Sequence, residues 1–515
     1  MSPSQPSRRM SAEDAFFLYF EKTHAPLHIT TVAIFDGEVP LDVVRENLAA
    51  RMHLIPRYRQ KAVFPPFFAG HPTWEDDPQF TVERHVYGVE VPSPGRDPQL
   101  TELACGISEE ALPRDRPLWD LGVVSGIAGG RTAFVQRVHH CMIDGVSAVE
   151  LALATLDLVP NPPPIPPPPA AWQPARPPDA VRSWGDALFD QWASNMSAIA
   201  EFQRNLLDPR ALSRVSADLA RSVWTAVGAA VRRTAPMIWN RPIGKRRAAA
   251  YTSVSFQEIR GIRSALGGTV NDAVLTIIGG ALGSYLREHK QPVEGRSVRI
   301  MIPVNVRKES EQGSLGNRVS MMLPRIPVGI VDPELRLQAV RAQMDRAKSA
   351  NEAGAFDTLL RLSENAPAVF EALIGAGSLP PGTVNLVVTN VPGPLTPLYT
   401  VGHRMLTTYG LLPLIGDLGI GIAVGSYDKA LIFCVTCDPT IVPDVERICE
   451  LIEDEFLKLR AAAGVAPSDL PDVTPVPVAA HTPPVRVKRA APAKRKAASR
   501  ARPKKRAVAS RSKRA

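Results

Sequence analysis

The sequence contains few cysteines and no long apolar run. Its five cysteines are spread over 515 residues, which is too few and too scattered for a disulfide framework. The polar N-terminal residues carry no apolar signal segment, and no stretch reaches the roughly 18 uninterrupted apolar residues of a membrane-spanning helix. The nearest candidate, residues 411–424, is interrupted by Pro413 and Asp417. We therefore expect a cytoplasmic protein that does not span a membrane.

Acidic residues are absent from the C-terminal end. Residues 486–515 contain 14 Lys and Arg residues but no Asp or Glu, so the remaining chain carries 46 basic against 51 acidic residues. We expect residues 463–515, which lack Phe, Trp and Tyr, to form a disordered basic tail. Three functions of this tail are open: binding to anionic lipid, binding to nucleic acid, and simple solubilisation. The lack of aromatic residues argues against base stacking, so lipid is favoured over nucleic acid.

Proline is concentrated in one internal segment. Eleven of the 50 prolines lie within residues 160–178, where fixed φ angles and missing amide hydrogens favour an extended polyproline II spacer. We predict an N-terminal half at 1–159, this linker together with amphipathic helices at 160–250, and a C-terminal half at 251–462. Both halves mix helix and strand patterns, so each is expected to be an α/β or α+β domain.

An apolar stripe with helical spacing follows the prolines, within residues 184–206. It includes Trp184, Trp192 and Phe202, which recur at steps that place them on one face of a helix. Packing of this stripe onto a domain core is the favoured interpretation. Contact of the stripe with a lipid surface is the alternative.

Two adjacent histidines lie where a predicted strand ends. Residues 121–127 and 132–140 predict a β-hairpin with a glycine turn, and His139 and His140 close its second strand. Because side chains alternate along a strand, the two imidazoles should point to opposite faces. One histidine is then a candidate base, and the other is a packed, hydrogen-bonded support.

Asp144 and Gly145 follow at short spacing and complete the pattern HHxxxDG. Asp144 is close to a predicted helix start, where it is suited to cap amides, bind an arginine or orient the loop. Gly145 permits close backbone approach. Taken alone, two adjacent histidines leave a metal site, a satisfied polar loop and catalysis open. The diverging side chains and the absence of an HExxH spacing argue against a metal site.

The complete pattern resembles that of the acyl-CoA-dependent acyltransferases, and within them the bacterial wax ester synthase/diacylglycerol acyltransferase family. Further motifs of this family are matched in the same order between residues 10 and 460. Pro117-Leu118-Trp119 is similar to its PLW motif, Asn271-Asp272 to its ND motif, and residues 389–394, TNVPGP, to its NVPGP segment. Several spaced motifs are more specific than HHxxxDG alone, which condensation domains share.

The resemblance implies an α/β fold of two chloramphenicol-acetyltransferase-like domains, joined by a proline-rich linker and a helical crossover, with a tunnel between them. It implies an O-acyltransferase that moves a long-chain acyl group from acyl-CoA to diacylglycerol or a long-chain alcohol, without a further cofactor or a metal. His140 is then the general base for direct attack of the alcohol on the thioester. His139 is its support and Asp144 forms a structural salt bridge. The alternatives are a carrier-protein-dependent, condensation-type enzyme and a non-catalytic lipid-binding protein.

Other residues have candidate roles in this site. Asn271 is a candidate donor to the oxyanion, with a helix cap as the alternative role. Asn390 is a candidate lining residue of the tunnel, and Trp119 packs structurally as one of its walls. Residues 245–247 form a basic run that is suited to CoA phosphates, although a solvated charge run is the favoured interpretation.

Cysteine chemistry is not expected to contribute. Cys141 neighbours His140 but should face away from it on an alternating backbone, so covalent catalysis is disfavoured. Cys434 and Cys437 form a CxxC without a second pair, and we interpret them as strand residues.

The implied products partition into lipid. We therefore expect peripheral association with the inner membrane or with lipid bodies, and acyl-CoA together with diacylglycerol or a long-chain alcohol as the molecular partners. No feature of the sequence indicates an oligomeric state.

Overall fold

The structure, a computed structural model, covers both halves of the chain and part of the proline-rich segment. The described residues are 9–65, 70–142, 151–168, 170–175, 233–305, 319–350, 354 and 382–468. The apolar stripe at 184–206, the basic tail, Asp144 and Gly145 lie outside the described residues.

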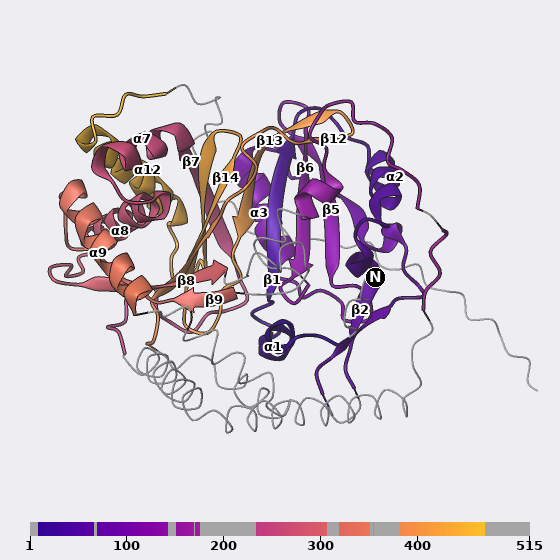
Figure 1. The fold of residues 1–515 in the computed structure, drawn as a ribbon, viewed down its shortest axis with the longest axis horizontal. Helices are drawn as coiled ribbons and strands as arrows, with labels where there is room; N and C mark the ends of the chain where they lie inside the picture. Colours follow the sequence, from indigo (N-terminus) through magenta and orange to yellow (C-terminus); the bar gives the residue numbers. More distant parts are fainter. Residues whose placement is uncertain are drawn as a thin grey trace, which may run out of the picture. The chain divides into compact units, whose positions relative to one another are not determined.

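A six-stranded sheet forms the centre of the N-terminal half (Figure 1). Its order is β12-β13-β1-β6-β5-β4, and neighbouring strands are antiparallel except β4 and β5. β5 and β6 form the predicted hairpin, whose turn contains Gly129 and Gly130 at positive φ, a conformation that glycine adopts without strain. The strands are β1 (His28–Phe35), β4 (Val86–Glu90), β5 (Trp119–Ile127), β6 (Arg131–His139), β12 (Tyr399–Thr400) and β13 (His403–Leu411).

A second, seven-stranded sheet forms the centre of the C-terminal half. Its order is β10-β8-β11-β14-β15-β7, and β9 also pairs with β8. β11 is parallel to both β8 and β14, and the other pairs are antiparallel. The strands are β7 (Ala248–Ser255), β8 (Ser297–Asn305), β9 (Val319–Met322), β10 (Arg325–Pro327), β11 (Leu386–Val391), β14 (Ile420–Tyr427) and β15 (Ala430–Cys437). A separate two-stranded sheet pairs β2 (Gln60–Val63) with β3 (Thr73–Asp76).

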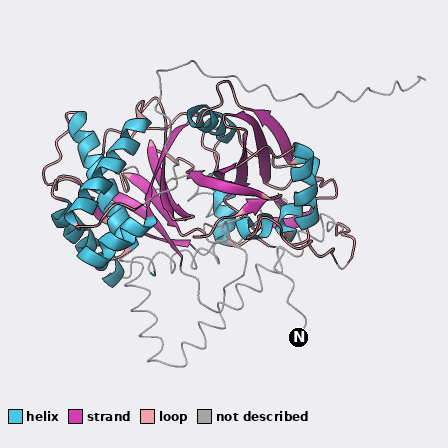
Figure 2. Ribbon diagram, turned by 90° about the horizontal axis from the view of Figure 1, so that it is seen from above, coloured by secondary structure: helices cyan, strands magenta, loops and turns pink. Residues whose placement is uncertain are grey.

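Helices cover the outer sides of the strands (Figure 2). The most buried helix is α8, in which 14 of 19 residues are buried. A β-carbon at Gly280 would collide with the Arg336–Glu455 ion pair, and one at Gly283 would collide with the carbonyl of Val328. Close packing therefore requires glycine at these two positions. The described helices are α1 (Ala12–Phe20), α2 (Leu41–Arg51), α3 (Asp97–Ser108), α7 (Phe256–Leu266), α8 (Val270–Glu288), α9 (Pro333–Ser349) and α12 (Val445–Ala462).

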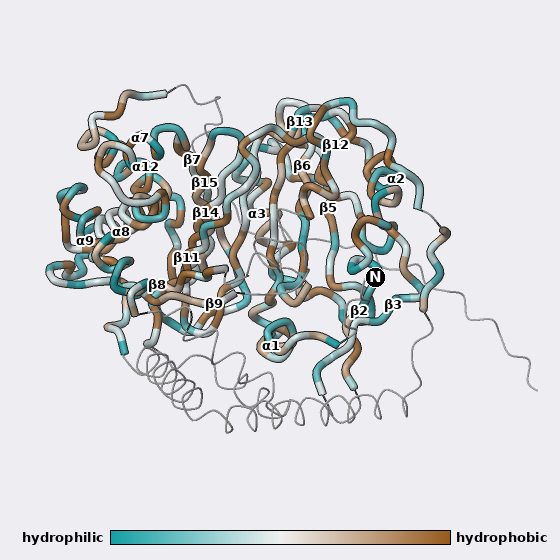
Figure 3. Tube along the Cα trace, in the orientation of Figure 1, coloured by the Kyte–Doolittle hydropathy of each residue, from teal (hydrophilic) through white to brown (hydrophobic). Residues whose placement is uncertain are grey.

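The two halves share strands and hydrophobic core. β13 follows β11 of the C-terminal half in sequence but pairs with β1, which places Tyr409 opposite Val32. On β15, Cys434 packs into the N-terminal core and its neighbour Phe433 into the C-terminal core. Because adjacent side chains of a strand point to opposite faces, this one strand joins both cores. Figure 3 shows largely hydrophobic residues along the strands of the C-terminal sheet and hydrophilic ones along α9.

Most predicted elements are confirmed, and so is the α/β fold class with two halves. The sequence pattern predicts strands at residues 28–35 and 430–437 and a helix at 333–349, and β1, β15 and α9 have these ranges. The pattern also predicts one strand over residues 320–326. The structure has two, β9 and β10, because Pro324 between them has no amide hydrogen to donate to a continuing strand. The tunnel and the helical crossover remain predictions.

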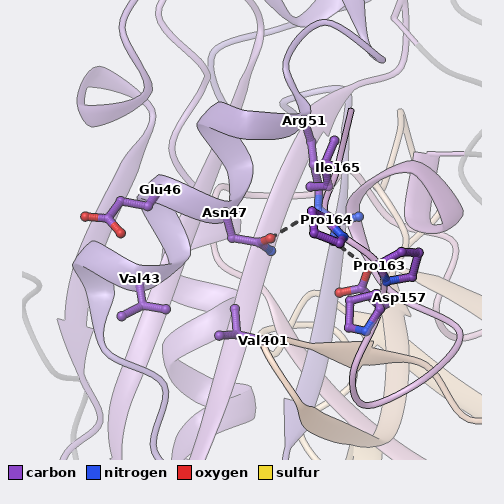
Figure 4. A pocket seen from close by; sticks show the side chains of 10 residues that line it. Val43, Glu46, Asn47, Arg51, Asp157, Pro163, Pro164, Ile165 and Val401 are labelled. Carbon is purple, nitrogen blue, oxygen red and sulfur yellow. Dashed lines mark hydrogen bonds and ion pairs between the residues drawn. The ribbon is translucent and has the colours of Figure 1, made fainter. Parts of the chain in front are cut away.

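The proline-rich segment and the residues just before it contact the N-terminal half. Asp157 exchanges two backbone hydrogen bonds of 2.8 Å with Tyr399, and its buried carboxylate lies 2.5 Å from Arg51. The segment then borders a cavity of about 330 Å³ against α2, which Pro162 to Ile165 help to line (Figure 4). Further on, the Trp172 ring lies 4.7 Å from the Arg59 guanidinium. This part of the predicted spacer is therefore fastened along one half.

No single helix among the described residues is long and apolar enough to cross a membrane. The consecutive helices α7 and α8 meet the length and composition criteria only as a pair, and they are bent by 100° at the break between them. Most of α8 is buried inside the protein, as expected for a core helix.

Candidate active site

Backbone hydrogen bonds fix the histidine dipeptide, His139-His140, at the end of β6. The amide of His139 donates to the carbonyl of Leu118 at 2.9 Å, and the amide of His140 donates to the carbonyl of Leu27 at 2.9 Å. His139 also lies opposite His28 in the register of β1 and β6. Two neighbouring segments therefore set the position of both histidines.

The imidazole of His139 is buried and engaged at both ring nitrogens. Its side chain is 1% exposed, and Nε2 lies 3.3 Å from Oε1 of Glu21. The amide of Cys141 donates to Nδ1 at 3.2 Å. Because Nδ1 accepts a hydrogen bond, this network assigns the ring proton to Nε2, facing the carboxylate. This geometry suits the supporting role that the sequence predicts for His139.

Glu21 is a functional candidate that sequence reasoning missed. It follows the last residue of α1, and its carboxylate accepts hydrogen bonds from the amide of Leu27 at 3.0 Å and from Arg114 at 2.9 Å. Burial alone would raise the pKa of Glu21, but His139, Arg114 and Leu27 together lower it to about 2. The sequence signal that could have identified Glu21 was its position. A carboxylate at the C-terminus of a helix interacts unfavourably with the helix dipole, so it needs another reason to be there.

The charges beside the dipeptide are balanced inside the protein. Arg137, fully buried on β6, forms a two-pronged pair with Asp120 at 2.9 and 2.5 Å. Burial, together with the positive charge of Arg137, lowers the pKa of His28 well below its ordinary value. His28 is therefore neutral, and it adds no positive charge next to His139.

His140 has different surroundings from His139. Its side chain is half-buried, and its ring stacks on Phe17 of α1 with centroids 3.9 Å apart and planes 10° apart. In the view of Figure 1, α1 lies below β1. The two imidazoles thus have separate partners, although β6 ends at His139, one residue earlier than predicted.

The cysteine thiols are unsuited to nucleophilic chemistry. Cys141 is 1% exposed, and burial raises its pKa well above the ordinary value. Burial also raises the pKa of Cys434 to about 12. A reactive cysteine must be present as the thiolate, so these thiols are inert at neutral pH. Cys434 and Cys437 lie on β15 and pack into different cores, which confirms that they are strand residues.

Asn271 and Asn390 lie together although they are distant in sequence. The side-chain amide of Asn390, near the end of β11, donates to Oδ1 of Asn271 at 3.3 Å. Asn271 is the second residue of α8, but the cap of that helix is Thr269, which forms a capping box with Asp272. Helix capping, the alternative role for Asn271, is therefore performed by another residue. Oδ1 of Asn271 accepts this hydrogen bond, and Nδ2 is the donor group of the side chain.

The structure places Trp119 in the core. Its side chain is 1% exposed, its ring lies 4.4 Å from the ring of Tyr58 and 4.5 Å from that of His85, and Nε1 donates to the carbonyl of Tyr58 at 2.8 Å. These contacts support a structural packing role for the PLW motif. A role for Trp119 in lining a substrate tunnel remains a prediction.

The basic run at 245–247 contacts the N-terminal half. Lys245 lies 2.7 Å from Glu110, and the buried guanidinium of Arg247 donates to the carbonyl of His24 at 3.0 Å. The amide of Arg247 donates to Glu109 at 2.8 Å. These contacts fasten the segment before β7 to the end of α3.

The structure therefore gathers the predicted residues into two groups. The histidine dipeptide lies with Phe17 and Glu21, and Asn271 lies with Asn390; among the described residues no hydrogen bond, ion pair or ring contact joins the two groups. The cavity in Figure 4 is lined by neither group. Within the described part of the chain, no three His, Cys, Asp or Glu side chains are arranged to hold a metal ion.

Solved structures of similar fold define the class. A wax ester synthase/diacylglycerol acyltransferase from Marinobacter aquaeolei VT8 matches with a TM-score of 0.62 at 23% identity, over 89% of this chain and 100% of that one. The starter condensation domain of rhizomide synthetase matches with a TM-score of 0.55 at 14% identity, over 89% of this chain and 94% of that one. The fold is thus the two-domain, chloramphenicol-acetyltransferase-like fold.

The chain belongs to the wax ester synthase/diacylglycerol acyltransferase family. Residues 10–274 match the model of its catalytic domain and residues 315–460 the model of its C-terminal domain. A probable diacylglycerol O-acyltransferase of Mycobacterium tuberculosis is 30% identical over 466 residues, 87% of this chain and 95% of that protein. A second is 31% identical over 469 residues, 88% of this chain and 99% of that protein. The protein is therefore an acyltransferase, as the sequence predicts.

Replacing Glu21 by glutamine should destabilise the protein in a pH-dependent way. The folded pKa of about 2 lies below the ordinary value of 4.5, so the ionised carboxylate stabilises the fold at neutral pH. This stabilisation, up to about 3 kcal/mol, is lost as the pH falls from about 4.5 toward 2. Thermal unfolding of wild type and Glu21→Gln should therefore differ at pH 7 and converge on acidification.

A matched control is Glu450→Gln. The Glu450 side chain is 62% exposed in its pair with Arg447, and such surface pairs contribute little to stability. Its unfolding temperature should stay close to that of wild type at every pH. A Glu21→Gln deficit that is equally large at acidic and neutral pH would show that the carboxylate charge is not its source.

Proposed function

We propose that this acyltransferase transfers a long-chain acyl group from acyl-CoA to the hydroxyl of diacylglycerol, and to long-chain alcohols as a second acceptor class. The proposal is supported by the names of the two mycobacterial relatives and by that of the family model. The observation that carries it is the contrast within the histidine dipeptide. His139 is buried and engaged at both ring nitrogens, whereas His140 is half-buried.

In the proposed mechanism His140 is the general base. An alcohol is a weak nucleophile at neutral pH, so its proton must leave as the oxygen attacks the thioester carbonyl. The O–H proton passes to the His140 imidazole, and the C–O bond forms. The tetrahedral oxyanion then collapses, the C–S bond breaks, and the CoA thiolate takes the proton from the imidazolium. Bonds and protons balance without a metal or a further cofactor.

The same mechanism needs no acyl-enzyme. The only cysteine adjacent to His140 is Cys141, whose burial keeps it a protonated thiol. The developing oxyanion needs hydrogen-bond donors, and the amide of Asn271 supplies one at the start of α8, where backbone amides of the first turn also lack intrahelical partners.

The acceptors and products are lipids, so we infer that the enzyme works at a membrane or lipid-body surface. Within the basic tail, residues 486–515 contain 14 Lys and Arg residues. We assign this segment to electrostatic attraction toward anionic lipid.

His140→Ala should lower kcat/KM by about 10²- to 10⁴-fold, the usual contribution of a positioned base. The assay uses purified protein, radiolabelled palmitoyl-CoA, and either diolein or hexadecanol as acceptor. Cys141→Ser is the adjacent control and should retain activity. Turnover that survives in His140→Ala, or a labelled acyl adduct that disappears in Cys141→Ser, would contradict the mechanism.

Asn271→Ala should lower kcat by about 10²-fold with little change in KM for acyl-CoA, because an oxyanion donor acts on the transition state. Thr269→Ser, which keeps the hydroxyl cap of α8, is the control for helix integrity. If Asn271→Ala and wild type share the same kcat, Asn271 is not the donor.

Deleting residues 486–515 should weaken flotation with vesicles that contain anionic lipid and remove most of the salt dependence of that binding. Activity on soluble short-chain substrates should be unchanged. Equal, salt-insensitive flotation of the full and shortened chains would argue that another surface contacts the lipid.

A further inference from the structure

The first helix of the chain contacts both members of the histidine dipeptide. Phe17 and Glu21 are four residues apart, so they project from the same side of α1 and its C-terminal end. The Phe17 ring stacks on His140 at 3.9 Å, and the Glu21 carboxylate lies 3.3 Å from Nε2 of His139. The last turn of α1 and the residue after it therefore contact the two imidazoles through two different interactions.

The position of α1 is fixed by its N-terminal cap and by its buried side chains. Its first turn is capped by the Ser11 hydroxyl, which accepts from the amide of Asp14 at 3.1 Å. Ala15 is fully buried and Leu18 is 3% exposed, and both belong to the N-terminal core. Side chains on rigid, packed elements hold functional groups more precisely than those on loops.

A chain of hydrogen bonds links the end of α1 to the backbone of His140. The Glu21 carboxylate accepts from the amide of Leu27 at 3.0 Å, and the carbonyl of Leu27 accepts from the amide of His140 at 2.9 Å. The same carboxylate therefore steadies both histidines, one through its ring and the other through its backbone. This chain fixes the backbone of His140, and the orientation of its ring depends on separate contacts.

The Phe17 ring is suited to set that orientation. The torsion that rotates an imidazole about its last bond is broad, so an isolated histidine ring samples many planes. A parallel ring 3.9 Å away, with an angle of 10° between the planes, restricts this rotation and covers one face of the imidazole. Substrate must then approach His140 at a ring edge or at the opposite face.

We propose that Phe17 is a positioning residue for the acyltransfer reaction: by stacking on His140, it fixes the plane of the imidazole so that the proton-accepting nitrogen stays directed at the acceptor hydroxyl. The inference rests on the proposed role of His140 as general base. Phe17 itself exchanges no proton and forms no bond with substrate. It acts on kcat through the fraction of time that the base spends in the reactive orientation.

The first test replaces the ring while keeping its bulk. Phe17→Leu should lower kcat about 3- to 10-fold with KM for acyl-CoA and acceptor unchanged, which corresponds to the loss of one aromatic pair. Phe17→Tyr, which keeps the ring, should restore kcat to near the wild-type value. Phe17→Met, a second variant without an aromatic ring, serves as the test should the leucine form fold poorly.

The control comes from the same helix. Phe20 packs on Phe16, with centroids 3.9 Å apart, so Phe20→Leu removes a comparable aromatic pair without touching His140. Its kcat should equal that of wild type. If Phe20→Leu loses as much kcat as Phe17→Leu, general packing of α1 is responsible and the inference is wrong.

An NMR measurement detects the stacking of Phe17 on His140 independently of enzymatic activity. The ring protons of His140 lie over the face of Phe17, so their NMR signals should be shifted upfield in protein labelled at histidine and assigned with His140→Gln. Phe17→Leu should remove this shift, and Phe20→Leu should leave it in place. An unshifted signal in wild type would overturn the inference.

Failure of the inference and failure of the proposed function give different results. If His140→Ala is inactive while Phe17→Leu keeps the wild-type kcat, the base is correct and Phe17 does not position it. If His140→Ala remains active, the proposed base is wrong, and the role of Phe17 falls with it.

Discussion

The histidine end of β6 depends on one buried carboxylate. Glu21 is 7% exposed, and removing its charge from water would be strongly unfavourable on its own. His139, Arg114 and the amide of Leu27 offset this cost. These partners come from β6, from the segment before β5 and from the segment before β1, so satisfying a single carboxylate fixes three parts of the backbone around the dipeptide. The geometry of the candidate site is thus a tertiary property of the N-terminal half.

The second constraint is the sharing of strands between the halves. Asn390 pairs in register with Val424 on β14, and Val424 pairs with Phe433 on β15. The next residue on β15, Cys434, packs into the N-terminal core. β11, which carries Asn390, is therefore tied through two neighbouring strands to the core that supports the histidines. The two groups of candidate residues are held within one continuous packing arrangement, although they lie on different sheets.

The sequence predicts local features of this arrangement well and distant contacts poorly. Alternation and helical spacing predict β1, β15 and α9 because each is a regular element with a clear apolar pattern. β14 is missed because its glycines weaken the strand pattern. The motifs indicate His140 and Asn271 as candidates. Nothing local in the sequence indicates that Phe17 stacks on His140 or that Asn390 forms a hydrogen bond with Asn271. Those contacts depend on how separate elements pack, which periodicity does not encode.

The two histidines are constrained in ways that suit different tasks. Moving the proton of His139 from Nε2 to Nδ1 would break the bond from the Cys141 amide and place a lone pair against Glu21. Each lost buried hydrogen bond costs roughly 1–3 kcal/mol, so these contacts favour one tautomer of His139. Stacking on Phe17, by contrast, restricts the plane of the His140 ring. A general base needs its ring held in one orientation, and the stack on Phe17 gives His140, the proposed base, a constraint of that kind.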